Sequence, residues 1–380
     1  MAQHRVDSSS LPSLQELRDN IDSVDDEILK ALQRRMELVA QIGEVKLQQG
    51  GAIYRPERER EILNRLAHKN ATQSDKAPLL NALAIEAIYH EIFATSRNLE
   101  LPQKVAFLGP IGSYTHQAAQ DRFGAMSEYI PLSTISAIFD ALSHKRVKYG
   151  VLPLENNTNG MVGESIDLLA THEFKIIAEI VLPIHHSFLS TCEHLDMVEK
   201  IFSKDIAFGQ CQKFLSAHNL SHIEQIPTDS TARAAQLAAQ TPRSAAIGSR
   251  IAGKLYNLPL MFENIQDSEH NKTRFVIVSD FANAPSGRDK TSLFVNLKGA
   301  EEVGSLYGLL GDFKKEGINL SKISSRPIRT KPSASEDGGF KMGFFIDCEG
   351  HYNDSAIQNL IAKRGDEIKW LGSYLPALAP

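Results

Sequence analysis

The chain has 380 residues, of which 42% are hydrophobic and 23% charged, and its formal net charge at pH 7 is −5. This length suffices for two or three domains with sizeable cores. Lysine and arginine are spread along the chain, whereas nucleic acids and anionic membranes select clustered positive charge. The composition therefore argues against nucleic-acid and membrane partners and favours small-molecule ligands.

The three cysteines fit no disulfide or metal-ligand spacing: Cys192, Cys211 and Cys348. Their odd number indicates free thiols in a reducing compartment. The N-terminal sequence MAQHRVDSSSLPS lacks the apolar core of a signal peptide, and no apolar run approaches the roughly 18 residues of a membrane span. We therefore expect a cytoplasmic protein.

Residues 13–100 show only helical periodicity. Apolar residues recur at three- and four-residue steps from Leu14 over about nine turns, until QQGG breaks the pattern. RPERERE starts a second predicted helix, and a third runs over 78–100. The first helix is longer than a compact monomer needs, so its apolar stripe is expected to pack against another subunit.

Two cations interrupt this apolar stripe. At about 100° per residue, Ile42 and Lys46 each lie within roughly 20° of Arg35. Unpaired buried charge is costly, so such cations need partners. Arg18 lies about 100° from Arg35 and could reach the same point only from a second copy of the helix. Alternatively, each side chain extends to solvent or pairs with a local acid.

The other two predicted helices contribute further polar groups. Ser96 shares a stripe with Ile92, and Glu100 follows it by one turn. Arg58 and Glu59 open the second helix. These groups predict a pocket that combines several cations with a hydroxyl and ionisable carboxyls. The expected ligand is a small dianion that carries a hydroxyl.

The sequence LRDNIDSVDDEILKALQRRMELVAQIGEVK, followed by RPEREREIL, resembles the all-helical chorismate mutase domain over residues 13–100. The resemblance implies an intertwined dimer that rearranges chorismate to prephenate. No proton moves in this step, so catalysis would rest on positioning and on stabilising the charge that develops on the ether oxygen. By position, Lys46 and Glu100 would face that oxygen, and Glu59 would bind the substrate hydroxyl. The substrate carboxylates would be bound by Arg18 of the partner subunit, Arg35, Arg58 and Ser96.

Two positions depart from the family pattern. Arg55 stands where some members have an acid, and Glu100 stands where some have glutamine. An ionised Glu100 would repel the developing oxyanion, so it must be protonated in order to donate a hydrogen bond; burial would favour that form. We predict that mutase activity rises toward acid pH and that Glu100→Gln flattens the profile.

From residue 104 to 280, short apolar runs alternate with helical patterns, which indicates an α/β sheet. Polar loops follow several runs: GPIGSYTHQAA, PLENNTNG, FGQCQKF and the start of NKTRFVIVSD. Strand-end loops of this kind converge on ligand crevices in α/β folds, although each alone could be a turn. His185 and His186, at the start of HHSFL, are interpreted as structural. The candidate ligand contacts are Ser113, Thr115, Glu155, Asn156, Gln210, Thr273 and Arg274.

These motifs have the order and similar spacing of those in prephenate dehydratase, which the sequence resembles over about 104–280. The resemblance implies two α/β lobes with the active site between them, where prephenate loses CO2 and hydroxide to give phenylpyruvate. This reaction needs no metal or redox cofactor. Thr273 is our choice for the hydrogen-bond donor to the departing hydroxide. Arg274 could bind a substrate carboxylate or hold the loop, and Glu155 could orient the site.

After a linker at 281–290, residues 288–376 show a β-α-β-β-α-β order that predicts a ferredoxin-like module. EVGSLYGLL and KISSRPIR resemble two motifs of the ACT domain, an amino-acid-sensing module. Tyr307 and Ser324 depart from those motifs and could weaken binding. Alternatively, the module serves only as a dimerisation surface. The resemblance implies a phenylalanine site between two subunits, formed by Gly304, Leu306, Ser325, Arg326 and Pro327.

The leading hypothesis is a bifunctional enzyme that performs both reactions without a cofactor, is inhibited by phenylalanine, and forms a dimer or tetramer. One alternative keeps the dehydratase but makes the mutase weak or inactive, because of Arg55 and Glu100. Another is a two-lobed ligand-binding sensor. A sensor has no need of Thr273 beside Asn156 and Gln210, nor of cations inside a helical domain.

Overall fold

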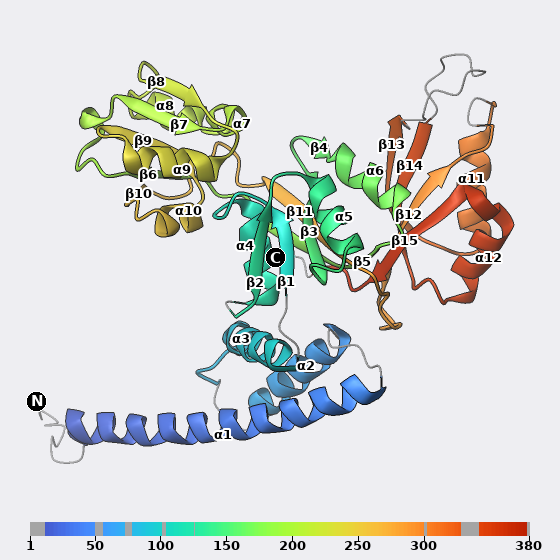
Figure 1. The fold of residues 1–380 in the computed structure, drawn as a ribbon, viewed down its shortest axis with the longest axis horizontal. Coiled ribbons are helices and arrows are strands. Elements are labelled where there is room, and N and C mark those ends of the chain that lie inside the picture. Colours follow the sequence, from blue (N-terminus) through green and yellow to red (C-terminus); the bar gives the residue numbers. More distant parts are fainter. Residues whose placement is uncertain are drawn as a thin grey trace, which may run out of the picture.

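The computed structural model comprises a helical region, a two-lobed α/β region and a C-terminal module (Figure 1). The two-lobed region lies between the other two along the chain and contacts both. Among the described helices, none has the length and apolar character required to cross a membrane. The structure describes residues 12–49, 56–72, 78–100, 104–124, 126–299, 302–327 and 342–377.

Three helices form the N-terminal region, as the periodicity predicts: α1 (Leu14–Gln49), α2 (Pro56–Thr72) and α3 (Ala82–Glu100). The third begins later than predicted because Asn81 caps it, accepting a hydrogen bond from the Ala84 N–H at 2.8 Å. α1 and α3 pack closely, since a Cβ on Gly43 would lie 3.2 Å from the Cα of Glu100. α1 ends at Gln49, within QQGG, whereas Gly50, Gly51 and Arg55 lie outside the described residues.

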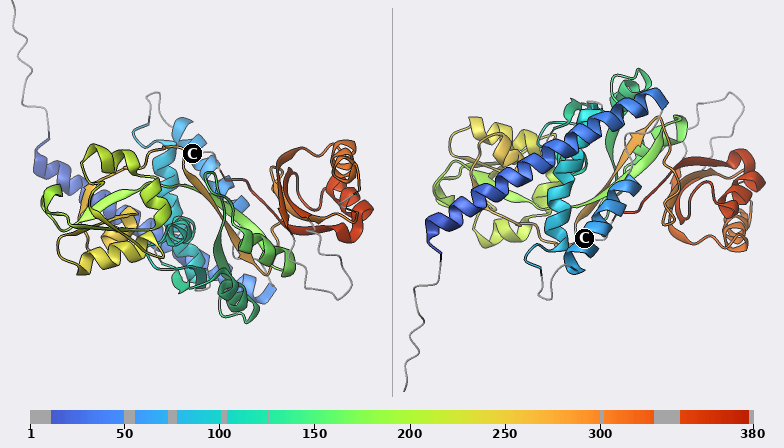
Figure 2. Two further views of the ribbon diagram at one scale, coloured as in Figure 1. Left: turned by 90° about the horizontal axis from the view of Figure 1, so that it is seen from above. Right: turned by 90° about the horizontal axis from the view of Figure 1, so that it is seen from below.

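Much of the apolar stripe of α1 is uncovered in the single chain. Ile21, Val24 and Ile28 are 59%, 53% and 51% exposed. The N-terminal part of α1 extends well beyond α2 and α3 (Figure 2). A row of exposed aliphatic side chains of this kind is typical of a surface that another polypeptide covers.

The first lobe is built on a six-stranded sheet in the order β2-β1-β3-β11-β5, with β4 paired to β3. β1, β2 and β3 are parallel, whereas β11 is antiparallel to both β3 and β5. α5 and α6 cover one face of the sheet and α4 covers the other. The elements are β1 (Lys104–Leu108), α4 (Tyr114–Phe123), β2 (Glu128–Leu132), α5 (Ile135–Ser143), β3 (Tyr149–Asn156), β4 (Gly160–Met161), α6 (Gly163–Thr171), β5 (Lys175–Pro183) and β11 (Lys272–Ser279).

The second lobe has a five-stranded sheet in the order β10-β6-β9-β7-β8. The chain enters this lobe after β5 and returns to the first lobe with β11, so two short segments join the lobes. The elements are β6 (Ser187–Ser190), η1 (Leu195–Met197), β7 (Lys200–Ser203), α7 (Asp205–Gly209), α8 (Gln212–Ala217), β8 (Glu224–Pro227), α9 (Thr231–Gln240), β9 (Ser244–Gly248), α10 (Arg250–Leu255) and β10 (Leu260–Phe262).

The C-terminal module has the predicted β-α-β-β-α-β order and an antiparallel sheet in the order β13-β14-β12-β15. The sheet face that is turned away from the module's own helices packs against the first lobe. On this face, Phe294, Phe345 and Leu371 belong to one buried cluster with residues of α5 and α6. The elements are β12 (Lys290–Asn296), α11 (Ser305–Lys315), β13 (Leu320–Pro327), β14 (Met342–Glu349), α12 (Ser355–Arg364), η2 (Gly365–Glu367) and β15 (Ile368–Tyr374).

Glycine allows β15 to approach the first lobe. Gly372 has a φ of 149°, and a Cβ at this position would lie 2.1 Å from the carbonyl oxygen of Ile176 on β5. Any larger residue would force the two elements apart. The contact between the module and the first lobe is therefore built into the backbone as well as into the side chains.

Candidate functional sites

Four of the predicted side chains meet between α1 and α3. Arg35 Nη1 donates a hydrogen bond to Ser96 Oγ, and Lys46 Nζ lies 2.6 Å from Glu100 Oε2. Ser96 is buried, and its hydroxyl donates to the carbonyl oxygen of Ile92 at 2.6 Å. The single chain thus gathers two cations, a hydroxyl and a carboxyl, which suits a ligand that carries carboxylates. We call this cluster the helical pocket.

Contacts fix the position of Arg35, but neighbouring groups compensate its positive charge only in part. Burial lowers its pKa from the ordinary value, and the nearby Tyr89 and Glu100 offset only part of that effect. Its guanidinium carbon lies 5.7 Å from the ring centroid of Phe93. An anion bound beside this guanidinium would therefore be favoured.

Two other predicted residues do not reach the helical pocket in the single chain. Arg18 is exposed and stands about 25 Å from Arg35 along the axis of α1. Arg58 is also exposed and pairs with Glu61 at 2.9 Å. For Arg18, this placement agrees with the expectation that it acts from another subunit.

Glu59 faces the junction with the first lobe instead of the helical pocket. Its carboxylate binds Arg97 of α3 and Arg122 of α4, the latter at 3.3 Å. Burial opposes ionisation of Glu59, but the charges of the two arginines outweigh it and lower its pKa. In the single chain, Glu59 joins the helical region to α4, and its expected contact with a substrate hydroxyl stays a prediction.

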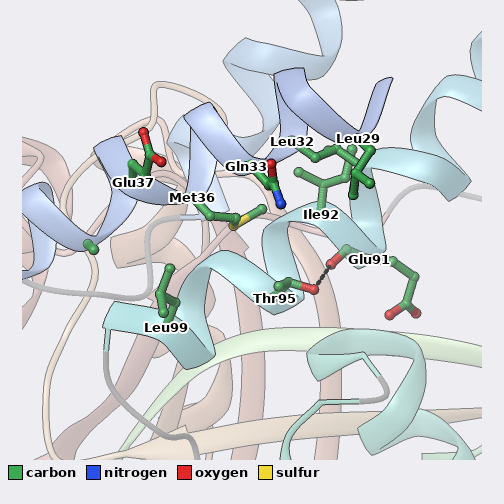
Figure 3. Close-up of a pocket in the computed structure, with 10 residues that line it drawn as sticks. Leu29, Leu32, Gln33, Met36, Glu37, Glu91, Ile92, Thr95 and Leu99 are labelled. Atoms are coloured by element: carbon green, nitrogen blue, oxygen red, sulfur yellow. Dashed lines mark hydrogen bonds between the residues drawn. The ribbon is translucent and has the colours of Figure 1, made fainter. Parts of the chain in front are cut away.

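An apolar groove of about 760 Å³ runs between α1 and α3 beside the helical pocket (Figure 3). Leu29, Met36, Ile92 and Leu99 are among the residues that line it. Met36 connects the two features, since its Sδ lies 3.9 Å from the hydroxyl of Ser96. The groove extends the exposed apolar stripe of α1 toward the charged groups.

A cleft of about 860 Å³ separates the two lobes. The ends of β1, β3 and β11 meet there with the N-terminal ends of α4 and α9, as the strand-end pattern predicts. The predicted contacts that line this cleft are Ser113, Thr115, Asn156, Gln210 and Thr273.

Asn156 and Thr273 lie opposite each other on β3 and β11. The Asn156 amide donates to Thr273 Oγ1 at 2.9 Å and to Asn271 Oδ1 at 2.8 Å. Its own oxygen accepts from the backbone N–H groups of Thr158 and Asn159, both at 3.0 Å. These contacts fix the amide. Because Thr273 Oγ1 accepts from Asn156, the threonine hydroxyl keeps its hydrogen for a ligand in the cleft.

Two capped helix N-termini line the cleft. Ser113 caps α4 by accepting from the His116 N–H at 3.2 Å, and Thr115 lies in the first turn. Ser230 caps α9 by accepting from the Arg233 N–H at 3.1 Å. Helix N-termini carry partial positive charge and unpaired N–H groups, so both ends favour an anionic ligand.

The structure brings His186 into the cleft, where the sequence pattern predicts only a structural role. The ring is buried, with Nε2 2.8 Å from Gln210 Oε1 and Nδ1 2.9 Å from the hydroxyl of Tyr114. The Tyr114 hydroxyl also donates its single hydrogen to the carbonyl oxygen of His185 at 2.8 Å. Burial lowers the pKa of His186, so the ring is neutral at pH 7. Its neighbour His185 is exposed.

The cleft lining also includes polar residues that the sequence pattern did not predict as ligand contacts, among them Asn271, Lys204 and Asp229. Lys204 is the only lysine or arginine among the described residues that line the cleft. Lys204 directly follows β7, and Asp229 comes two residues after β8. The strand-end rule could therefore have found both, and the sequence PTDSTARAA at the end of β8 is a visible signal for Asp229.

Arg274 and Glu155 do not line the cleft. Successive residues of a strand face opposite sides of the sheet, and both of these side chains face away from the ligand space. Arg274 pairs with acidic residues of β5 and β14, and Glu155 pairs with Lys322 of β13. The Arg274 guanidinium is buried in a different interface, which favours a holding role over the alternative substrate contact.

The C-terminal candidates lie at the start of α11 and on the edge strand β13. Arg326 is half-buried and makes hydrogen bonds of 2.7 and 2.6 Å to Asp167 of α6. Within one chain it therefore holds the module against the first lobe. The other four candidates are exposed: Gly304, Leu306, Ser325 and Pro327.

Two family models match the chain. Chorismate mutase type II matches residues 17–101, and prephenate dehydratase matches residues 105–283. The first match covers the helical region, and the second covers both lobes of the α/β region.

Known proteins resemble the chain over nearly its whole length. It is 38% identical over 371 residues to a bifunctional chorismate mutase/prephenate dehydratase of Aquifex aeolicus, covering 97% of this chain and 99% of that one. It is 35% identical over 374 residues to one of Pseudomonas aeruginosa, covering 96% and 98%. A solved prephenate dehydratase from Arthrobacter aurescens, in complex with L-Phe, aligns with a TM-score of 0.63 at 28% identity, covering 73% of this chain and 93% of that one.

Proposed function

The chain belongs to the family of bifunctional chorismate mutase/prephenate dehydratases, and from this premise we propose which of its residues perform each reaction. The helical region rearranges chorismate to prephenate, and the two-lobed region converts prephenate to phenylpyruvate. The observation that carries this division of labour is the presence of two separate polar sites, the helical pocket and the cleft.

In the helical pocket, Arg35 and Ser96 bind a carboxylate of chorismate. Lys46 and Glu100 face the ether oxygen, where negative charge develops in the transition state. In the unliganded chain these two side chains bind each other at 2.6 Å, so the ether oxygen has to replace that contact. Lys46 then stabilises the oxyanion, and a protonated Glu100 donates a second hydrogen bond.

A second copy of the chain completes this pocket. Arg18 cannot reach the pocket of its own subunit, and the apolar groove beside it continues into the exposed stripe of α1. A second α1 laid along the groove would bury both surfaces and deliver its own Arg18. We therefore favour an intertwined dimer of the helical regions as the active mutase.

The mutase assignment is tested by Lys46→Ala in the full chain. Removing one donor to a developing oxyanion typically costs about 10²- to 10³-fold in kcat, so chorismate consumption should fall by that order. Prephenate consumption should stay at the wild-type rate, because the cleft is untouched. Lys30→Ala, on an exposed part of the same helix, is the matched control. Equal mutase rates in the two variants would contradict the assignment.

In the cleft, Thr273 donates a hydrogen bond to the hydroxide that leaves prephenate. Asn156 holds Thr273 Oγ1 as an acceptor, so the hydroxyl hydrogen is directed away from the protein. Aromatisation of the ring supplies the driving force. The enzyme therefore has to orient the substrate and stabilise the leaving oxygen.

Prephenate carries two carboxylates, and the cleft offers positive potential at separate places. The N-termini of α4 and α9 each provide a partly positive helix end. Lys204 supplies a full charge from the second lobe. Gln210, oriented by His186, provides an amide for the substrate hydroxyl or a carboxylate.

The dehydratase assignment is tested by Asn156→Asp. An ionised aspartate accepts hydrogen bonds and cannot donate, so it would draw the Thr273 hydroxyl hydrogen toward itself. We expect kcat for prephenate to fall by about 10²-fold or more, as when a transition-state donor is lost. Mutase activity in the same preparation serves as the internal control for folding. An undiminished dehydratase rate would contradict the role of this pair.

The C-terminal module acts as an ACT domain that binds phenylalanine and inhibits the dehydratase. Its topology, together with the exposed Gly304, Leu306, Ser325 and Pro327, supports this assignment. Arg326 would first have to release Asp167, unless the site uses only its neighbours. Calorimetry on the full chain should detect phenylalanine binding, and Gly304→Val should remove it, because the φ of 89° at this position strains a branched residue. Absence of binding to the wild type would contradict the assignment.

We further assign the chain to a reducing, cytoplasmic setting. Cys192, Cys211 and Cys348 are all free, and two of them are buried. Burial raises the pKa of the Cys211 thiol to about 12, which keeps it protonated and unreactive. Free, inert thiols of this kind are usual where disulfides do not form.

A further inference from the structure

The β3–β11 ladder carries two adjacent residue pairs that face opposite sides. Thr273 pairs with Asn156 across the ladder, and both line the cleft. The next pair is Arg274 with Glu155, and both turn toward the C-terminal module. One short two-stranded segment therefore holds the proposed catalytic pair on one side and a charged pair on the other.

Arg274 joins β11 to three strands of the C-terminal module through a buried polar network. Its Nη1 lies 2.5 Å from Asp347 Oδ2, and its Nη2 lies 2.7 Å from the hydroxyl of Tyr374. Ser292 links those two groups at 2.5 and 2.6 Å. Glu179 of β5 lies 2.7 Å from Arg274 Nε. All five residues are at most 9% exposed. Losing one of these contacts would therefore leave a buried polar group without a partner and would cost free energy.

Glu155 makes a similar contact with the C-terminal module from the neighbouring strand, β3. Its carboxylate pairs with Lys322 of β13. Beside this pair, the ladder register shifts between Arg274 and Phe275. A local irregularity of this type bends a strand and re-aims its side chains, and such features recur next to active sites. The β3–β11 ladder is therefore irregular at the point where it contacts both the cleft and the C-terminal module.

We propose that Arg274 and Glu155 are positioning residues through which the C-terminal module sets the spacing of Thr273 and Asn156. Breaking a buried ion pair leaves an uncompensated charge, so the module cannot shift without moving these strand residues. A hydrogen bond weakens outside about 2.7–3.2 Å, and the Asn156–Thr273 contact is 2.9 Å. A displacement of less than about 1 Å is therefore enough to misdirect the Thr273 hydroxyl. The inference rests on the proposed roles of the cleft and of the module.

A different ion pair between the same two regions offers a control. Lys369 of β15 lies 2.9 Å from Glu173, which precedes β5 and does not line the cleft. Removing this pair takes one ion pair from the same interface and leaves the ladder intact. Comparing the two pairs therefore distinguishes loss of the regulatory coupling from a general weakening of the contact between the module and the first lobe.

The test measures phenylalanine binding and dehydratase inhibition in the full chain. Lys322→Met removes the partner of Glu155, and Lys369→Met is the control. We expect both variants to bind phenylalanine with wild-type affinity. Inhibition at saturating phenylalanine should weaken at least about fivefold in Lys322→Met and remain as in the wild type in Lys369→Met. Full inhibition in Lys322→Met, or equal loss in both variants, would overturn the inference.

The Arg274 contact is tested separately by Asp347→Asn, which preserves volume and removes one charge. A positioning role predicts that kcat for prephenate falls about tenfold while KM is unchanged, because the groups that bind the substrate remain in place. Normal mutase activity verifies that the chain is folded. An unchanged kcat would overturn the role of Arg274. A wild-type chain that ignores phenylalanine would instead refute the regulatory assignment, and a wild type inactive on prephenate would refute the function of the cleft.

Discussion

His186 contacts Tyr114 and Gln210 in the cleft through a buried ring whose charge depends on pH. Burial lowers its pKa, so the folded chain takes up this proton at a lower pH than the unfolded chain does. Protonation puts a hydrogen on both ring nitrogens and a positive charge at the buried contact with Tyr114 and Gln210. The contribution of the neutral ring to stability is therefore present above the ordinary histidine pKa of about 6.5 and is lost as the pH falls through the lowered value.

We predict an acid limb in the dehydratase profile that depends on this residue. For the wild type, kcat/KM for prephenate should fall reversibly as the pH drops below about 6.5. His186→Gln should lower kcat/KM at pH 7 by about tenfold, since one or two hydrogen bonds of about 1 kcal/mol are lost, and should remove the acid limb. Rates measured between pH 5 and 8, in steps across the range, provide the check. An acid limb that persists in the variant would assign it to another group.

Lys204 should govern affinity more than rate. It is exposed at the edge of the cleft, where a charge pair with a carboxylate is worth about 1 kcal/mol or less. Lys204→Met is therefore expected to raise KM for prephenate about fivefold with little change in kcat. Lys213→Met, an exposed lysine of the same lobe outside the cleft, should leave KM unchanged. Identical steady-state parameters in the two variants would exclude the contact.

Residue types and spacing predicted side chains that line the cleft at strand ends, but they did not predict which way each strand residue faces. Thr273 and Asn156 follow from the strand-end pattern, and both line the cleft. Arg274 and Glu155 stand next to them in the sequence and turn to the opposite side. The sequence alone could not show which of two neighbouring residues faces the ligand, because both strands are buried on both faces.

The exposed apolar stripe of α1 is the surface that we most expect another polypeptide to cover. Val24 is 53% exposed on this stripe, so Val24→Glu costs a single chain little stability but places a charge inside the dimer that we propose. We expect the helical regions to dissociate and mutase activity to be lost, while dehydratase activity remains. Asp26→Lys, on the opposite side of the helix, is the control. Light scattering that shows the same oligomer for both variants would contradict this packing.

Interior elements were more predictable than edge elements. The apolar runs of β1, β3 and β11 predicted interior strands of the first sheet, and that of β5 predicted an edge strand that packs against the C-terminal module. The strands β2, β8 and β10 had no such signal, and each lies at the edge of its sheet. An edge strand buries fewer side chains, as the half-exposed pattern of β8 illustrates, so its composition differs little from that of a loop.

For the whole molecule, the two activities should respond to pH in opposite directions. Protonation of Glu100 turns a group that repels the ether oxyanion into a hydrogen-bond donor, whereas protonation of His186 disturbs the cleft. Lowering the pH should therefore raise the mutase rate of the same preparation that loses dehydratase activity. Glu100→Gln should flatten the mutase profile and leave the dehydratase profile unchanged. Parallel profiles in the wild type would contradict the separate roles.

Contacts between regions were the part of the fold that sequence patterns could not supply. Glu59 binds Arg122 across more than sixty positions of the chain, and Arg326 binds Asp167 across more than one hundred and fifty. The local sequence around each of these residues is equally compatible with a contact inside its own region. Only the three-dimensional arrangement shows that they hold the helical region and the C-terminal module against the first lobe.

The most direct test of the account supplies chorismate to the full chain carrying Thr273→Ala and follows chorismate, prephenate and phenylpyruvate together. The wild type should convert chorismate to phenylpyruvate. The variant should consume chorismate at the wild-type rate and accumulate prephenate, because only the donor in the cleft is lost. Thr273→Ser, which keeps a hydroxyl at the same position, should restore phenylpyruvate formation. Phenylpyruvate production by Thr273→Ala at the wild-type rate would contradict the central claim.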